Sequence, residues 1–177
     1  MNLPVLIIFI GEITFWFFLL ISVILRYQLG FKKISISMLI MTVIINILQM
    51  IVIFVHLFYG AKPTFFHGLT AVFIGFSLIY GRRTIQWADK WAAYKWSAGS
   101  KPIKVDKSAN ISYQWNEFYR VCLCVGLITT LILISFFFVP FEDAFWLIYW
   151  LVVNVSIIIF WLFFGPLKAI KKAQTKR

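Results

Sequence analysis

Residues 64–96 read TFFHGLTAVFIGFSLIYGRRTIQWADKWAAYKW, and this stretch decides which class of protein the chain belongs to. Its first half, residues 64–80, is an apolar run, and its second half begins at Gly81 with two arginines. Aromatic and charged residues then follow one another as far as Trp96. Apolar helices belong in hydrocarbon, whereas aromatic rings beside basic residues are typical of the headgroup layer. The stretch therefore predicts a helix that leaves a membrane and continues at its surface.

The composition of the whole chain excludes an ordinary soluble domain. Of its 177 residues, 62 % are hydrophobic and 13 % are charged, against about 45–50 % and about 25 % in soluble domains. A bilayer is the solvent that accommodates this excess of apolar side chains. The net charge of +11 would suggest nucleic acid for a soluble protein. Here the basic residues lie between apolar runs, so no nucleic-acid partner is expected.

Five apolar segments are long enough to cross the hydrocarbon core, which requires about 20 helical residues. The sequence predicts an all-α integral membrane bundle in a single domain. The first segment is interpreted as a retained span, because Glu12 interrupts it and no cleavage site precedes Arg26. Gly165 and Pro166 are expected to end the fifth span. The predicted spans are residues 4–25, 34–58, 64–80, 118–139 and 144–164, with a loop at 81–117, helical in its first part, and a basic tail at 165–177.

Basic residues are distributed unevenly between the two ends of such a bundle. With five spans, sixteen of the seventeen Lys and Arg fall on one side. Lys62 alone falls on the other side, together with Glu142 and Asp143. The positive-inside rule assigns the sixteen to the cytoplasm. The N-terminus is therefore expected outside, with the C-terminus and the amphipathic extension of the third helix in the cytoplasm.

Small residues line one side of the third span. Gly68, Ala71 and Gly75 recur at helical spacing, which lets another backbone approach closely. The neighbour is expected to be a helix of the same chain, although a partner membrane protein or a second copy would fit as well.

Polar residues inside the spans predict a pocket near the outer ends of the helices. Lipid offers such groups no partners, so they should face other helices or water. Glu12 lies at about the depth of Gln49, and His56 and His67 flank the outer turn. The alternative is a protonated Glu12 that only joins two helices. The hypothetical ligand pocket is lined by Glu12, Asn46, Gln49, His56 and His67.

Two histidines and a carboxylate also form a set that zinc or copper accepts. Their spacing matches no metal motif, and no metal or other cofactor is predicted. HExxH, GxSxG, P-loop and CxxC patterns are absent from the sequence, so no catalytic residue is predicted. Cys122 and Cys124 are two positions apart in one span and point to different sides, which makes a disulfide between them unexpected.

The start of the polar segment predicts a site for an anionic lipid headgroup. Basic side chains there stand among tryptophans, a combination typical of the membrane interface. The alternative is a basic belt that only sets the topology, and Asp89 is expected to pair with a nearby base. The candidate headgroup residues are Arg82, Arg83, Trp87, Lys90 and Trp91.

The chain resembles a known family at four short motifs: HGLTA at residues 67–71, GF at 75–76, GR at 81–82 and WAD at 87–89. The chain resembles the YmcC-like proteins, small integral membrane proteins of Bacillus-type bacteria. The resemblance extends over most of the chain and implies a bacterial cytoplasmic membrane. The family has no assigned activity, so the resemblance implies no catalytic role.

Three functional hypotheses follow. The leading one is a non-enzymatic membrane module that binds a partner protein or lipid. The second is a carrier of a small molecule or ion that uses the outward-facing pocket around Glu12. The third is a lipid-modifying enzyme at the cytoplasmic surface around Arg82, Arg83 and Asp89.

Overall fold

A computed structural model of the chain describes residues 3–96 and 110–174. The described residues form helices joined by short turns and contain no β-strand. Five of these helices are long and apolar enough to cross a membrane, so the predicted all-α membrane bundle is confirmed. The elements are α1 (Leu3–Tyr27), α2 (Lys32–Phe58), α3 (Phe65–Trp96), α4 (Ile111–Phe136), the 3-10 turn η1 (Phe141–Asp143), α5 (Phe145–Leu162), the π-helical turn η2 (Phe163–Leu167) and α6 (Lys168–Gln174).

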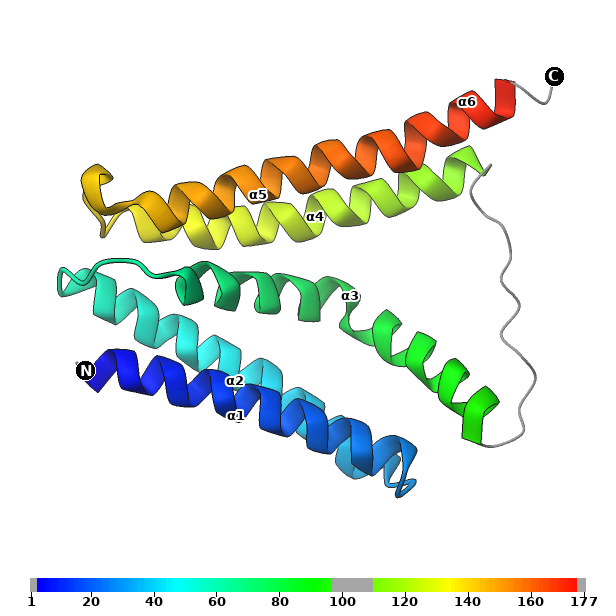
Figure 1. Cartoon of the computed structure of the whole chain (residues 1–177), viewed down its shortest axis with the longest axis horizontal. Coiled ribbons are helices and arrows are strands. Elements are labelled where there is room, and N and C mark those ends of the chain that lie inside the picture. The colour runs from blue at the N-terminus through cyan, green and yellow to red at the C-terminus, as the bar shows by residue number, and fades with distance from the viewer. Residues whose placement is uncertain (1–2, 97–109, 175–177) are drawn as a thin grey trace.

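The helices form two antiparallel pairs with α3 between them (Figure 1). α1 packs on α2, α4 packs on α5, and α3 contacts both α2 and α4. Figure 1 shows that α3 bends partway along its length, so that its second half turns from α4 toward α1 and α2. We call the end with the α2–α3 and α4–α5 turns the histidine end. The opposite end, where α3 ends and α4 begins, is the basic end.

Two helices extend beyond the predicted spans. α4 begins at Ile111, before the span predicted from residue 118, and the side chain of Asn110 caps it by accepting a hydrogen bond from the Tyr113 N–H at 2.9 Å. The helix of the fifth predicted span does not stop at Gly165 and Pro166. A helical run continues from Phe145 to Gln174 through a π turn that contains Pro166. The wider turn accommodates the missing N–H and the bulk of the proline ring.

The small residues of α3 are covered by the α4–α5 pair. Gly68 lies directly against the indole of Trp150, whose Nε1 donates a hydrogen bond to the Phe65 carbonyl at 3.0 Å. A Cβ atom at Gly75 would lie 2.5 Å from Ile128 Cγ1, and Ala71 is fully buried. This face therefore packs against helices of the same chain.

Substitution at Gly68 should show how tightly α3 is held against α5. A methyl group at this position meets the Trp150 ring, so Gly68→Ala should destabilise the fold by about 1–3 kcal/mol through overpacking. The matched control is Gly126→Ala in α4, where an added Cβ meets no atom within 4 Å. That variant should be neutral or gain about 0.4–1 kcal/mol. Thermal denaturation in mild detergent checks both, and equal midpoints would contradict the packing described.

Candidate functional site

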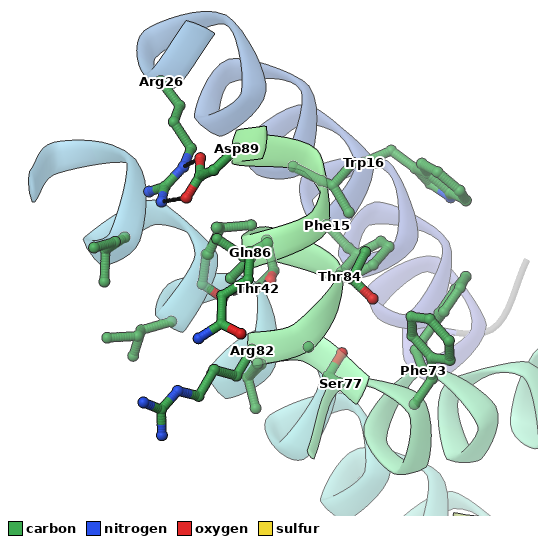
Figure 2. Close-up of a pocket in the computed structure, with 18 residues that line it drawn as sticks. Phe15, Trp16, Arg26, Thr42, Phe73, Ser77, Arg82, Thr84, Gln86 and Asp89 are labelled. Carbon is green, nitrogen blue, oxygen red and sulfur yellow. Dashed lines mark hydrogen bonds and ion pairs between the residues drawn. The ribbon is translucent and has the colours of Figure 1, made fainter. Parts of the chain in front are cut away.

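A pocket of about 560 Å³ lies between α1, α2 and the bent part of α3 (Figure 2). The bend creates it, because the second half of α3 reaches the basic end of the α1–α2 pair. The pocket extends from aromatic side chains deep in the bundle to an ion pair at the basic end. Its apolar wall consists of Phe15, Trp16, Leu19, Ile36, Leu39, Ile40, Val43, Phe73, Phe76 and Ile85.

Aromatic packing shapes the deep part of the pocket. The rings of Phe15 on α1 and Phe73 on α3 stack with centroids 4.7 Å apart. Trp16 meets the Phe73 ring edge-on at 5.8 Å. Such stacked and edge-on pairs contribute stability beyond the area that they bury. They hold α1 against the first half of α3 and leave the apolar space open on the side of α2.

An ion pair closes the basic end of the pocket. Arg26, at the end of α1, donates from Nε to Asp89 Oδ1 at 2.6 Å and from Nη2 to Oδ2 at 2.5 Å. The Arg26 side chain is only 8 % exposed, whereas that of Asp89 is 35 % exposed. Asp89 therefore pairs with a base, as expected, but the base is 63 residues away in the sequence. Sequence reasoning considered its neighbours on α3 and missed Arg26.

Two arginines at this site have hydrogen-bonding capacity left. Arg26 Nη1 is buried and has no partner among the described atoms. Arg82 lines the pocket with an exposed side chain and has no ion pair within the described part of the chain. Buried donors are almost always satisfied in native proteins, so the polar end of the pocket is suited to an acceptor-rich group.

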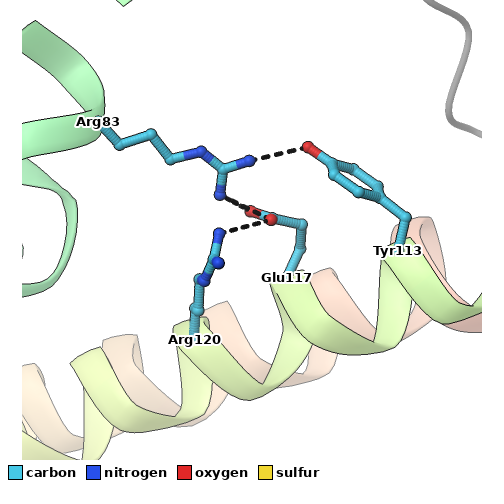
Figure 3. A network of polar contacts seen from close by, with 4 residues as sticks. All are labelled: Arg83, Tyr113, Glu117 and Arg120. Carbon is cyan, nitrogen blue, oxygen red and sulfur yellow. Dashed lines mark hydrogen bonds and ion pairs between the residues drawn. The ribbon is translucent and has the colours of Figure 1, made fainter. Parts of the chain in front are cut away.

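A second polar cluster joins α3 to α4 (Figure 3). Arg83 Nη1 lies 2.6 Å from both carboxylate oxygens of Glu117, and its Nη2 donates to the Tyr113 hydroxyl at 2.9 Å. Arg120 Nη1 donates to the same carboxylate at 3.0 Å. The contacts of Arg83 therefore join α3 to α4. Of the candidate headgroup residues, Arg82 lines the pocket and Arg83 belongs to this cluster.

The other candidate headgroup residues lie on the extension of α3 beyond the pocket. Trp87 and Trp91 are exposed, with ring centroids 6.3 Å apart, and Lys90 between them is exposed too. None of the three is among the described residues that line the pocket. They fit an interfacial anchor on the outer surface of the bundle.

The structure divides the residues predicted to form an outer pocket. Asn46 and Gln49 are buried on α2, where the Gln49 amide fills the space above Gly11 of α1. A groove of about 270 Å³ beside Gln49 includes neither histidine among its described lining residues. His56 and His67 stack at the histidine end with ring centroids 6.3 Å apart. The side chain of Glu12 lies outside the described residues, although its backbone belongs to α1.

The hydrogen bonds of His67 determine its tautomer. The backbone N–H of Thr64 donates to Nδ1 at 3.0 Å, so Nδ1 accepts and the neutral ring carries its proton on Nε2. Nε2 is buried and has no partner among the described atoms. Metal coordination through Nε2 would require its lone pair, so the ring in this state is not ready to bind a metal.

Fold and contacts together define a class, the helical integral membrane proteins. Over 94 residues, the chain is 36 % identical to a protein of Bacillus subtilis (strain 168) named "Uncharacterized membrane protein YmcC". The match covers 52 % of this chain and 51 % of that protein. The predicted resemblance to the YmcC-like proteins is therefore confirmed, but over about half of the chain rather than most of it, and the match spans about half the length of this relative. No family model and no solved structure matches the chain.

The tautomer of His67 can be measured directly. In protein carrying ¹⁵N-labelled histidine, His67 should give the resonances of a neutral ring protonated at Nε2 and accepting at Nδ1. Thr64→Pro removes the backbone N–H donor, so His67 should no longer favour the tautomer protonated at Nε2. Thr64→Val removes only the hydroxyl, so the same tautomer should remain favoured. Protonation at Nδ1 in the unmodified protein would contradict the assignment.

A double-mutant cycle tests the ion pair that closes the pocket. Arg26→Ala and Asp89→Ala should each destabilise the fold, and the double variant should lose less than their sum. The expected coupling is about 1–2 kcal/mol, because the guanidinium is buried while the carboxylate is partly solvated. The control pair is Lys62 and Asp143, 2.7 Å apart with a Lys side chain that is 77 % exposed; it should couple by about 0–1 kcal/mol. Unfolding free energies in mixed micelles give both values, and equal coupling would argue against a special role for Arg26.

Proposed function

We propose that this protein is a non-enzymatic module of the bacterial cell membrane that holds a membrane lipid in the pocket between α1, α2 and α3. The observation that carries the proposal is the polarity of the pocket. Its deep wall is apolar, and its basic end bears an ion pair and Arg82, which has no ion-pair partner among the described residues. Its volume of about 560 Å³ falls in the range of about 300–1,000 Å³ common for ligand sites.

A multi-pass topology with the basic end in the cytoplasm supports this proposal. The positive-inside rule favours that orientation. The pocket would then open at the inner leaflet, where anionic lipids attract Lys and Arg. The exposed rings of Trp87 and Trp91 would lie at the same level, as interfacial aromatic residues do.

The contacts of Asp89 favour binding over catalysis. A general base needs an oxygen free to take a proton. Both oxygens of Asp89 accept hydrogen bonds from Arg26, and the described pocket lining contains no histidine or cysteine. A lipid is favoured over a partner protein as well, because the small-residue face of α3 is covered by α4 and α5.

Filling the pocket should remove the lipid. An added Cβ at Gly81, which lines the pocket, meets no atom within 4 Å, so Gly81→Phe should fit in the helix and occupy ligand space. Gly126→Phe is the matched control, since that glycine is also helical and unobstructed but is not among the described lining residues. Native mass spectrometry of protein extracted in mild detergent should find a retained lipid in the unmodified protein and in Gly126→Phe. Loss of most of that lipid is expected in Gly81→Phe, and equal retention in all three would refute the proposal.

A further inference from the structure

We further propose that the pocket prefers an anionic phospholipid with an uncharged headgroup, of the phosphatidylglycerol type, over a zwitterionic one. This inference rests on the lipid binding proposed above and specifies the chemical class of the ligand. It follows from the charged side chains that line the pocket and from their partners.

The net charge of the pocket lining is one argument. Arg26, Arg82 and Asp89 are the charged residues among its described lining. Arg26 and Asp89 neutralise each other through two short hydrogen bonds. Arg82 remains, and it is exposed and has no ion-pair partner among the described residues. One uncompensated guanidinium is complementary to one phosphodiester, which it can bind through two parallel hydrogen bonds.

The carboxylate of Asp89 supplies the argument against a zwitterionic headgroup. The ammonium of an ethanolamine or choline lipid needs an anion or an aromatic face near it. Among the described lining residues, Asp89 is the one carboxylate, and both of its oxygens are engaged by Arg26. An ammonium at this position would face Arg26 and Arg82 without a free anion to balance it. A glycerol headgroup brings no positive charge and avoids this repulsion.

The order of side chains along α3 matches the order of groups in a phospholipid. Along the helix Phe73 and Phe76 come first, Arg82 follows, and Gln86 and Asp89 come last, toward the ion pair at the basic end. Arg82 and Asp89 are seven residues apart, which corresponds to about 10 Å along a helix and to the same side of it. A phosphate at Arg82 would therefore place the acyl chain among the aromatic rings. The headgroup hydroxyls would lie toward Asp89 and toward Arg26 Nη1, which has no partner among the described atoms.

The experiment is a competition between two lipids with identical acyl chains. The purified full-length protein is stripped of lipid and offered equimolar phosphatidylglycerol and phosphatidylethanolamine in mixed micelles, and native mass spectrometry gives the ratio bound. The unmodified protein should favour phosphatidylglycerol by roughly tenfold, because the phosphodiester contact is common to both lipids and only the ethanolamine ammonium is repelled by the uncompensated charge of Arg82. Arg82→Gln should bring the ratio close to one, and Arg82→Lys should retain part of the preference. Lys168→Gln, an exposed cation on α6 outside the described pocket lining, should retain all of it.

The ion pair provides a second, independent test of the charge argument. Arg26→Gln frees the carboxylate of Asp89, so the preference should fall or reverse even though Arg82 is intact. Adding Asp89→Asn to this variant removes the freed charge and should restore the preference. If Arg26→Gln fails to fold, the test uses Asp89→Asn by itself. This variant removes the partner of Arg26 and should raise the ratio of bound phosphatidylglycerol to phosphatidylethanolamine.

The outcomes separate this inference from the proposed function. Equal binding of both lipids by the unmodified protein, with loss of both in Gly81→Phe, would overturn the headgroup preference and leave lipid binding in place. A preference that Arg82→Gln does not change would overturn the role of Arg82. Failure to retain either lipid would overturn the proposed function and the inference together.

Discussion

The ion pair between Arg26 and Asp89 is the interaction on which the rest of the site depends. Hydrocarbon supplies no hydrogen-bonding partners, so a guanidinium buried near the membrane interface needs an acceptor within the protein. Asp89 provides that acceptor from the bent half of α3, and this contact holds the bend against α1. The bent half of α3 is the third wall of the pocket beside α1 and α2, and the ion pair fastens this wall to α1 at the basic end.

Besides the Arg26–Asp89 pair, a second polar cluster, around Glu117, joins α3 to α4. Glu117 of α4 binds Arg83, one position after Arg82, and also accepts from Arg120. The first turns of the α3 extension are therefore held to α4 by Arg83 and to α1 by Asp89. This arrangement separates the roles of two adjacent arginines. Arg83 contributes to the position of the helix, while Arg82 keeps its charge available at the pocket.

Hydropathy predicted the class of fold and the number of membrane-crossing helices, because the bilayer imposes an apolar length that short windows of sequence reveal. It did not predict where the helices end. α4 begins at a polar cap and the last helix passes through Pro166, and both features depend on local backbone hydrogen bonding rather than on apolar content. The candidate site was predicted only in part. Arg82 follows from a local pattern of basic and aromatic residues, whereas the pairing of Arg26 with Asp89 depends on a bend that no local pattern encodes.

The polar residues of α2 show why a buried polar stripe is ambiguous evidence for a pocket. The backbone carbonyl of Ser35 accepts a hydrogen bond from the Ser22 hydroxyl at 3.1 Å, and Asn46 Nδ2 donates to the Thr42 carbonyl at 2.9 Å. The first contact joins α1 to α2 and the second lies within α2, while Asn46 Oδ1 is buried without a partner among the described atoms. Polar residues in a span require partners, but neighbouring helices supply them as well as water does. A ligand site needs open volume in addition, and in the described residues the larger open volume lies beside Arg82, where the composition of the spans alone placed no cavity.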